Sequence, residues 1–303
     1  MNIKTITISS TLLFCLMGLA GKSYGSDAIT AFDIANKYLD QRREAHKSYI
    51  AKFYLRTCKY RVVQSQMKCS EKPRSSIVEN IAKTFDLDTR SLNFILEPAR
   101  DKGIGMFFEE YWETEKPNST WIYLPALGKV KRIISSKESA DSGSFFGSEF
   151  AVEDLEERKP LEYEFKILGE DKVKVVFAGV VEERDAWIIE WTPNSKRKER
   201  TQYSRSVTWI DKERYVRLKE EYYKFDNSEK VIKTLNLKDF IQQNGHWVSK
   251  NLTMNNLATK RVSTIDKIAL VLDQKVDDEF LTRRTLTDFA FKERYLKKYR
   301  TYF

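Results

Sequence analysis

The 303-residue chain has few of the residues that mark several common classes of protein. Six prolines and 11 glycines exclude a collagen-like or linker-dominated chain. Only two histidines occur, His46 and His246, and neither belongs to a metal-ligand spacing such as H-E-x-x-H. The G-x-S-x-G nucleophile elbow is absent as well. We therefore expect no catalytic residues, no metal and no cofactor, and the protein is predicted not to be an enzyme.

Long apolar runs are confined to the first 25 residues, which have the pattern of an export signal. Lys4 provides a short positive start, and residues 6–20 are apolar or small. Ser23 and Gly25 place small residues at the −3 and −1 positions of a cleavage site after Gly25. The run is too short for a spanning helix, and an uncleaved anchor is the competing interpretation. We predict a signal peptide over residues 1–25 and a single soluble domain over residues 26–303.

Cysteine is scarce: three occur, and Cys15 lies within the predicted signal. The remaining pair, Cys58 and Cys69, would enter an oxidising compartment, where a closed small loop contributes about 2–3 kcal/mol. The pairing requires that the two positions face each other across a hairpin. Two independent thiols are the alternative, and the lack of nearby histidines argues against a metal site. We predict a disulfide between Cys58 and Cys69.

Aromatic residues are abundant, with 18 Phe, 15 Tyr and 6 Trp, and such residues are typical of strands and cavity walls. Residues 161–167 alternate strictly between apolar and charged side chains, and several later runs repeat this period of two. Turn residues separate the runs at short intervals, which favours antiparallel neighbours. We expect about ten or eleven strands in one large, curved antiparallel sheet with an apolar inner face.

Residues 27–44 predict one clear helix, in which apolar residues recur at helical spacing and form a stripe. The stripe consists of Ala28, Ala31, Phe32, Ala35, Tyr38 and Leu39. A curved sheet must cover its inner face, and this helix is expected to cap it. Because one helix rarely fills so wide a sheet, an apolar cavity is expected to remain. The predicted fold class is therefore mainly β with a few helices, an unclosed β-barrel capped by a helix.

The most distinctive stretch lies between residues 118 and 155. It reads Trp121-Ile-Tyr-Leu-Pro-Ala-Leu-Gly-Lys-Val-Lys-Arg132, then Ser144-Phe-Phe-Gly-Ser-Glu-Phe150 and Glu153-Asp-Leu155. The stretch resembles the LolA-like periplasmic family of the outer-membrane lipoprotein-sorting type, whose pattern is W-x-Y-L-P-A-L-x-x-V-x-R-I and S-F-x-G-S-D-F-x-x-E-D-L. Glu149 stands where this pattern has Asp. Residues 94–103 resemble the family's F-x-x-P-A-D-x-R-G segment, and the similarity extends over roughly residues 27–290.

The resemblance implies a half-barrel of the LolA/LolB type that holds acyl chains in an apolar hollow. It implies a location in the periplasm of a Gram-negative bacterium and a role as a carrier or chaperone of lipid or lipoprotein cargo bound for the outer membrane. The implied partners are this cargo and a membrane exporter or an outer-membrane acceptor, and we expect a monomer. A carrier needs an apolar lumen, since each buried CH₂ favours an apolar host by about 0.8 kcal/mol.

Candidate ligand-binding residues follow from strand parity and from the loop in the motif. Phe145 and Phe146, in the loop over residues 139–148, are candidates for the mouth of the cavity, and the alternative is a surface loop with both rings packed on the core. Parity places six further residues on the apolar face of the sheet, where they face either cargo or the helix. These are Trp121, Tyr123, Leu161, Tyr163, Phe165 and Ile167.

Several other functions have weaker support. A non-catalytic accessory subunit of a resistance-nodulation-division type exporter would use the sheet as a docking surface. A hydrolase would need a catalytic constellation in the cavity, and tryptophans on the strands suit either the core or the stacking of glycans. The net charge of +9 and the basic residues 196–200 would suit a nucleic acid, but export argues against that partner. Solvation, an anionic headgroup or an acidic partner explains the basic residues instead.

The basic and aromatic residues 294–303 have three interpretations. They would suit a membrane surface, a tail packed on the domain or a frayed end. The sequence alone does not choose among the three.

Overall fold

The computed structural model describes residues 29–44, 46–64, 66–134 and 143–303, so the predicted signal over residues 1–25 lies outside the described residues. Strands dominate, and they run as β1 Ser48–Val63, β2 Gln66–Cys69, β3 Arg74–Phe85, β4 Asp88–Glu97, β5 Gly105–Glu110, β6 Ser119–Leu124, β7 Lys129–Ile133, β8 Tyr163–Phe177, β9 Val180–Pro193, β10 Tyr203–Asp211, β11 Arg217–Lys224, β12 Asn227–Gln243, β13 His246–Asn256 and β14 Arg261–Leu272. The helices are α1 Ala31–Glu44, α2 Val152–Leu155, α3 Ser195–Lys198, α4 Arg284–Thr287 and α5 Phe289–Tyr299.

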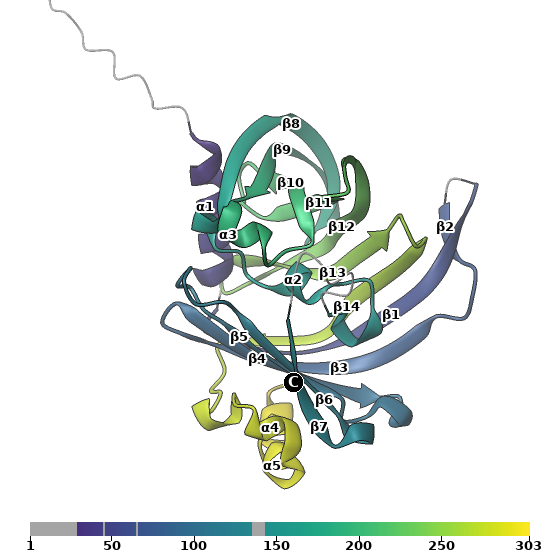
Figure 1. Cartoon of the computed structure of the whole chain (residues 1–303), viewed down its shortest axis with the longest axis vertical. Helices are drawn as coiled ribbons and strands as arrows, with labels where there is room; N and C mark the ends of the chain where they lie inside the picture. Colours follow the sequence, from purple (N-terminus) through teal and green to yellow (C-terminus); the bar gives the residue numbers. More distant parts are fainter. Residues whose placement is uncertain (1–28, 45, 65, 135–142) are drawn as a thin grey trace, which may run out of the picture.

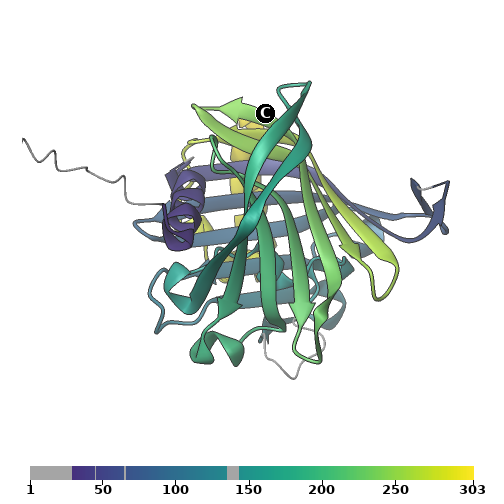
Figure 2. The same cartoon turned by 90° about the horizontal axis from the view of Figure 1, so that it is seen from above.

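The strands form one 14-stranded sheet in the order β11-β10-β9-β8-β12-β13-β14-β1-β3-β4-β5-β6-β7, with β2 paired to β1. The pairings are antiparallel apart from one parallel contact between Phe240 and Phe177, and β11 also pairs with β12. The sheet curves so strongly that its two halves face each other without closing into a barrel (Figures 1 and 2). The predicted fold class is confirmed.

The expected number of strands was too low, and β5 shows the physical reason. Met106, Phe107 and Phe108 are consecutive, and all three are buried. Met106 and Phe108 face the inner side of the sheet, whereas Phe107 packs with the C-terminal helices on the other side. A strand that is covered on both faces has no alternation of polar and apolar residues, so the period of two does not reveal it.

Helix α1 covers the part of the inner face formed by β8, β9 and β10. Its N-terminus has a reciprocal cap, since the Asp33 amide donates to Thr30 Oγ1 over 3.1 Å and the Thr30 amide donates to Asp33 Oδ2 over 3.0 Å. The helix thus begins at Ala31, four residues after the predicted start. Four of its residues, Ile34, Ala35, Tyr38 and Leu39, are buried against Ile189, Trp191 and Ile210.

Helices α4 and α5 cover the opposite, outer face of β3 to β6 (Figure 1). Phe291, Leu296 and Tyr299 are buried there, so the C-terminal residues form a packed tail. Arg300 fastens this tail, because its guanidinium makes two hydrogen bonds, of 3.1 and 2.7 Å, with the fully buried carboxylate of Glu79 on β3. No helix among the described residues has the length and apolarity needed to cross a membrane.

The hairpin of β1 and β2 extends beyond the body of the sheet and carries a disulfide between Cys58 and Cys69 (Figure 1). All four residues of β2 are exposed. The hairpin therefore has little packing of its own, and the disulfide joins its two strands in addition to their backbone pairing.

Candidate functional site

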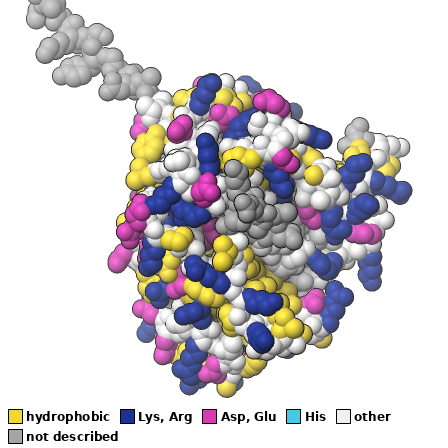
Figure 3. Space-filling model, in the orientation of Figure 1, with side chains coloured by type: hydrophobic (Ala, Val, Ile, Leu, Met, Phe, Trp, Pro, Cys, Tyr) yellow, Lys and Arg dark blue, Asp and Glu magenta, His cyan; other side chains and the backbone are white. Residues whose placement is uncertain are grey.

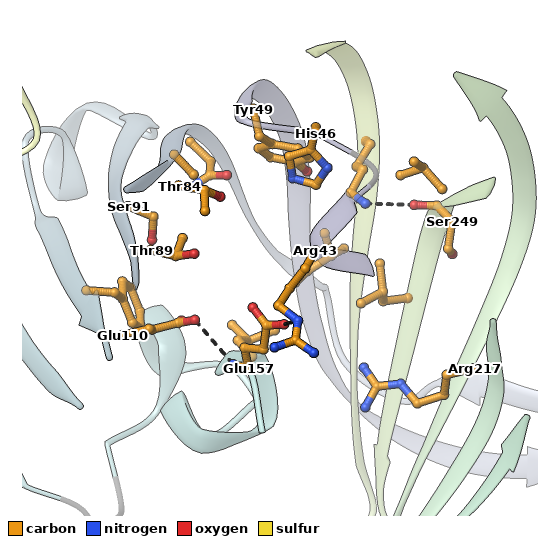
Figure 4. Close-up of a pocket in the computed structure, with 18 of the residues that line it drawn as sticks. Arg43, His46, Tyr49, Thr84, Thr89, Ser91, Glu110, Glu157, Arg217 and Ser249 are labelled. Carbon is orange, nitrogen blue, oxygen red and sulfur yellow. Dashed lines mark hydrogen bonds and ion pairs between the residues drawn. The ribbon is translucent and has the colours of Figure 1, made fainter. Parts of the chain in front are cut away.

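A cavity of about 330 Å³ opens on the inner face of the sheet. It is bounded by the last turns of α1, by the segment around α2, and by strands from both halves of the sheet. Its volume lies at the lower end of the range of about 300–1,000 Å³ that is typical of small-molecule sites. Figure 4 shows its polar lining residues.

One side of the cavity is apolar. Leu237 on β12, Leu252 on β13 and Ile265 on β14 lie opposite one another in the strand register and line the cavity together. At the inner end, the ring of Phe145 lies 6.3 Å from the rings of both Phe53 and Phe108. This apolar wall offers a surface on which a hydrocarbon chain can exclude water.

The opposite side is polar, which the sequence did not predict. On β3 and β4, Thr84 is paired with Thr89, and Asn80 with Asn93. Ser91 lies between the threonine pair and the asparagine pair, and all five side chains line the cavity. The inner face is therefore divided into an apolar wall on β12 to β14 and a polar stripe on β3 and β4.

Charged groups at the rim are held in ion pairs. Arg43 contacts Asp40 at 2.5 Å and Glu157 at 3.6 Å, and its guanidinium lies 3.9 Å from the ring of Trp112. The carboxylate of Glu110 accepts a hydrogen bond of 3.3 Å from the Glu157 amide (Figure 4). These contacts join the end of α1 to the α2 segment and fix one edge of the opening.

Residues 143–155, which carry the second half of the motif, cross the inner face. Phe150 is fully buried, and Glu149 binds Arg261 over 3.0 Å and accepts from Asn256 over 2.8 Å. The Glu149 amide also donates to Ser263 Oγ over 2.9 Å. Glu149 therefore anchors this segment at the ends of β13 and β14.

Glu153 and Asp154 of α2 are buried and attach the segment to β10 and β12. Glu153 accepts from Thr201 Oγ1 at 2.7 Å and from Arg197 at 3.3 Å. Asp154 accepts a hydrogen bond of 2.6 Å from the Tyr203 hydroxyl. Burial, together with the carboxylates of Asp154 and Glu153, raises the pKa of Tyr203 well above its ordinary value. The tyrosine therefore stays a hydrogen-bond donor.

A second buried ionic group lies beside this one. The Glu220 carboxylate is fully buried and contacts Arg158 at 2.5 Å and Arg217 at 2.6 Å. Burial alone would raise the pKa of Glu220, but the two guanidinium groups outweigh burial and lower it. Arg217 also lines the cavity, so this group supports the cavity wall.

The basic residues 196–200 have structural partners. Arg197 contacts Glu153 and Glu162, and Arg200 contacts Glu162 at 2.9 Å. Figure 3 shows Lys and Arg side chains dispersed among acidic and apolar ones on the face that it presents. Arg197 and Arg200 are thus used internally and do not form a free basic loop.

The eight candidate ligand-binding residues lie in different parts of the structure, and only some of them are near the cavity. Phe145 lines the cavity, and Phe146 packs beside it with a ring distance of 4.7 Å. Trp121 and Tyr123 pack with the C-terminal helices on the outer face. On β8, Tyr163 and Phe165 pack with α1 and Ile167 is exposed, whereas Leu161 lies in the short 3-10 turn before β8 and is also exposed. Residues 139–142 of the predicted mouth loop lie outside the described residues.

The sequence does not predict the polar stripe, because the inner faces of β3 and β4 carry both polar and apolar side chains. Its residues are small and neutral, and such residues resemble ordinary turn or surface positions in a sequence. The signal that was available is the spacing: Thr89, Ser91 and Asn93 alternate with apolar or charged residues at a period of two.

These features define a mainly β protein with a LolA-like half-barrel and a cavity between helix and sheet. A DUF1329 family protein from Desulfovibrio piger is 24% identical with a TM-score of 0.70, and the match covers 84% of this chain and 97% of that one. An outer membrane lipoprotein-sorting protein domain from Vibrio parahaemolyticus is 23% identical with a TM-score of 0.69 over 85% and 98% of the two chains. A LolA superfamily protein from Nitrosomonas europaea is 16% identical with a TM-score of 0.59 over 84% and 99%.

The family assignment comes from a match to residues 87–288 by a family model described as "Uncharacterized protein". The chain belongs to this family, and its fold is that of LolA superfamily proteins. No curated protein matches the sequence significantly.

Proposed function

We propose that this protein is a non-catalytic carrier that binds an acyl chain of a lipid or lipoprotein in the cavity of its half-barrel. The observation that carries the proposal is the apolar wall of Leu237, Leu252 and Ile265 within a cavity of about 330 Å³. The volume favours one chain over several, because it lies at the small end of the usual range.

The energetics suit transport. Ten buried methylene groups would contribute about 8 kcal/mol at about 0.8 kcal/mol each. Association and ordering consume a large part of that, since the loss of translational and rotational freedom costs several kcal/mol. Binding is then reversible, and a carrier requires this because it has to release its cargo.

The proposed location is the periplasm, where the cargo would travel toward the outer membrane. The export-signal pattern of residues 1–25 supports this location, as does the disulfide between Cys58 and Cys69, since such bonds persist in oxidising compartments. A membrane exporter would supply the cargo, or an outer-membrane acceptor would receive it.

The test is gentle extraction of the full chain from its native envelope, followed by mass spectrometry of the small molecules that accompany it. We expect an acyl lipid in a stoichiometric amount that is lost in organic solvent. Recovery of the protein without lipid, in a stable complex with a membrane pump, would contradict the proposal and favour an accessory subunit of an exporter.

A further inference from the structure

Four residues of the polar stripe, Thr84 on β3 and Thr89, Ser91 and Asn93 on β4, carry the inference. Thr84 and Thr89 are directly paired in the register, and Ser91 and Asn93 follow on the same face of β4. All four line the cavity, and Figure 4 shows Thr84, Thr89 and Ser91 grouped at one side of it. The four residues therefore place three hydroxyl groups and one amide in a row.

None of these four side chains has a hydrogen-bond partner among the residues that the structure describes. Asn93 is the most informative, because it is only 5% exposed. Its amide atoms nevertheless remain accessible from the cavity, so a polar group of a ligand can take the place of water there. By contrast, the neighbouring Asn80 amide donates to the Leu92 carbonyl over 3.3 Å.

Several cationic side chains of the cavity have partners elsewhere, but the Lys47 side chain, which also lines the cavity, has none among the described residues. Lys83 contacts Asp278 at 2.5 Å, and Lys267 donates to the Ser249 carbonyl over 2.7 Å. Arg43 is held by Asp40 and Glu157 at the rim. The stripe itself is neutral, and hydroxyl and amide groups both donate and accept hydrogen bonds. The hydroxyl groups of a ligand can donate to and accept from these side chains, so they match the stripe directly.

We propose that the stripe binds the hydroxyl-bearing headgroup of an amphiphile whose hydrocarbon chain lies on the apolar wall of β12 to β14. The inference rests on the proposed function and deepens it, because it names the class of cargo. The headgroup enters the cavity with the chain. Its hydrogen bonds to Ser91 and Asn93 replace those that it made with water.

The experiment compares two ligands with the same chain and different headgroups, monolauroylglycerol and laurate. Calorimetric titration of the full mature chain measures both dissociation constants below the critical micelle concentrations. Ser91→Ala and Asn93→Leu each remove hydrogen-bonding groups from the stripe, and Ser75→Ala, at an exposed position of β3, is the matched control.

We expect each stripe variant to weaken the binding of monolauroylglycerol about fivefold, which corresponds to one hydrogen bond. Laurate binding should change less than twofold, and Ser75→Ala should alter neither ligand. The melting temperature of Asn93→Leu without ligand should equal or exceed that of the wild type, because the amide has no partner to lose. A lowered melting temperature would instead assign Asn93 a structural role and overturn the inference.

The failures are distinguishable. If laurate binds as well as monolauroylglycerol and the stripe variants affect both equally or not at all, the headgroup inference is wrong while the carrier remains. If the wild type binds neither ligand, the carrier proposal fails and the inference fails with it.

Discussion

Replacement of Glu220 by Gln tests whether the buried ionic group beside the cavity attaches the segment after α2 to β11. Glu220 is fully buried, and its carboxylate lies 2.5 Å from Arg158 and 2.6 Å from Arg217. The substitution keeps the shape but leaves two largely buried guanidinium groups without a counter-charge. Loss of one partner from a buried ion pair costs about 3–5 kcal/mol, so we expect a loss of this size in the free energy of unfolding.

Urea unfolding at pH 7, followed by tryptophan fluorescence, measures the effect. The matched control is Glu221→Gln, because Glu221 is the next residue and pairs with Lys219 at a more exposed position. Because both side chains of this pair are partly exposed, Glu221→Gln should lose less stability than Glu220→Gln. Equal losses for the two variants would refute the argument from burial.

The same variant has a pH signature. The pKa of Glu220 is lower in the folded chain than its ordinary value, since Arg158 and Arg217 outweigh burial. Its contribution to stability is therefore complete above the unfolded pKa of about 4.3 and is lost as the pH falls through the folded value. Glu220→Gln should lose less stability than the wild type between neutral pH and acid pH. Parallel pH profiles of the two proteins would contradict the assignment.

Three further changes have expected outcomes. Phe145→Ala should destabilise the chain by about 3–5 kcal/mol and enlarge the cavity, because Phe145 is only 2% exposed; a loss below 1 kcal/mol would show that the segment does not pack there. Arg300→Ala should cost about 2–3 kcal/mol, since it leaves the buried carboxylate of Glu79 without its charged partner, and unchanged protease resistance of the C-terminal helix would contradict this. Cys58→Ser should lower the free energy of unfolding by about 2–3 kcal/mol, and the wild type under reducing conditions should match it; a larger effect of reductant on the variant than on the wild type would be inconsistent with a single Cys58–Cys69 bond.

The fold was largely predictable, because strands with one solvent-exposed face show alternating polar and apolar residues in the sequence. Residues 161–167 alternate between apolar and charged side chains, and the strand β8 begins within them. β5 was not found, since Phe107 and Phe108 are buried on opposite faces. The apolar stripe predicts the helix but not its start, because the start is set by the reciprocal hydrogen bonds between Thr30 and Asp33 and not by apolar spacing.

The site was much less predictable. Parity assigns a residue to a face of the sheet, but it does not say what covers that face. Trp121 and Phe165 are both apolar strand residues, yet one packs with the C-terminal helices and the other with α1. Long-range pairing decides which positions remain for a ligand, and Leu237 meets Leu252 and Ile265 only once β12, β13 and β14 are aligned.

The measurement that addresses the carrier proposal most directly is the laurate affinity of a variant with a filled cavity. Ala82 on β3 lines the cavity, and Ala82→Phe would place a ring inside it. Ala258→Phe, in the exposed turn between β13 and β14, adds the same ring away from the cavity. We predict that Ala82→Phe weakens laurate binding at least tenfold while Ala258→Phe binds like the wild type. Undiminished binding by a folded Ala82→Phe would show that the hydrocarbon is held somewhere else.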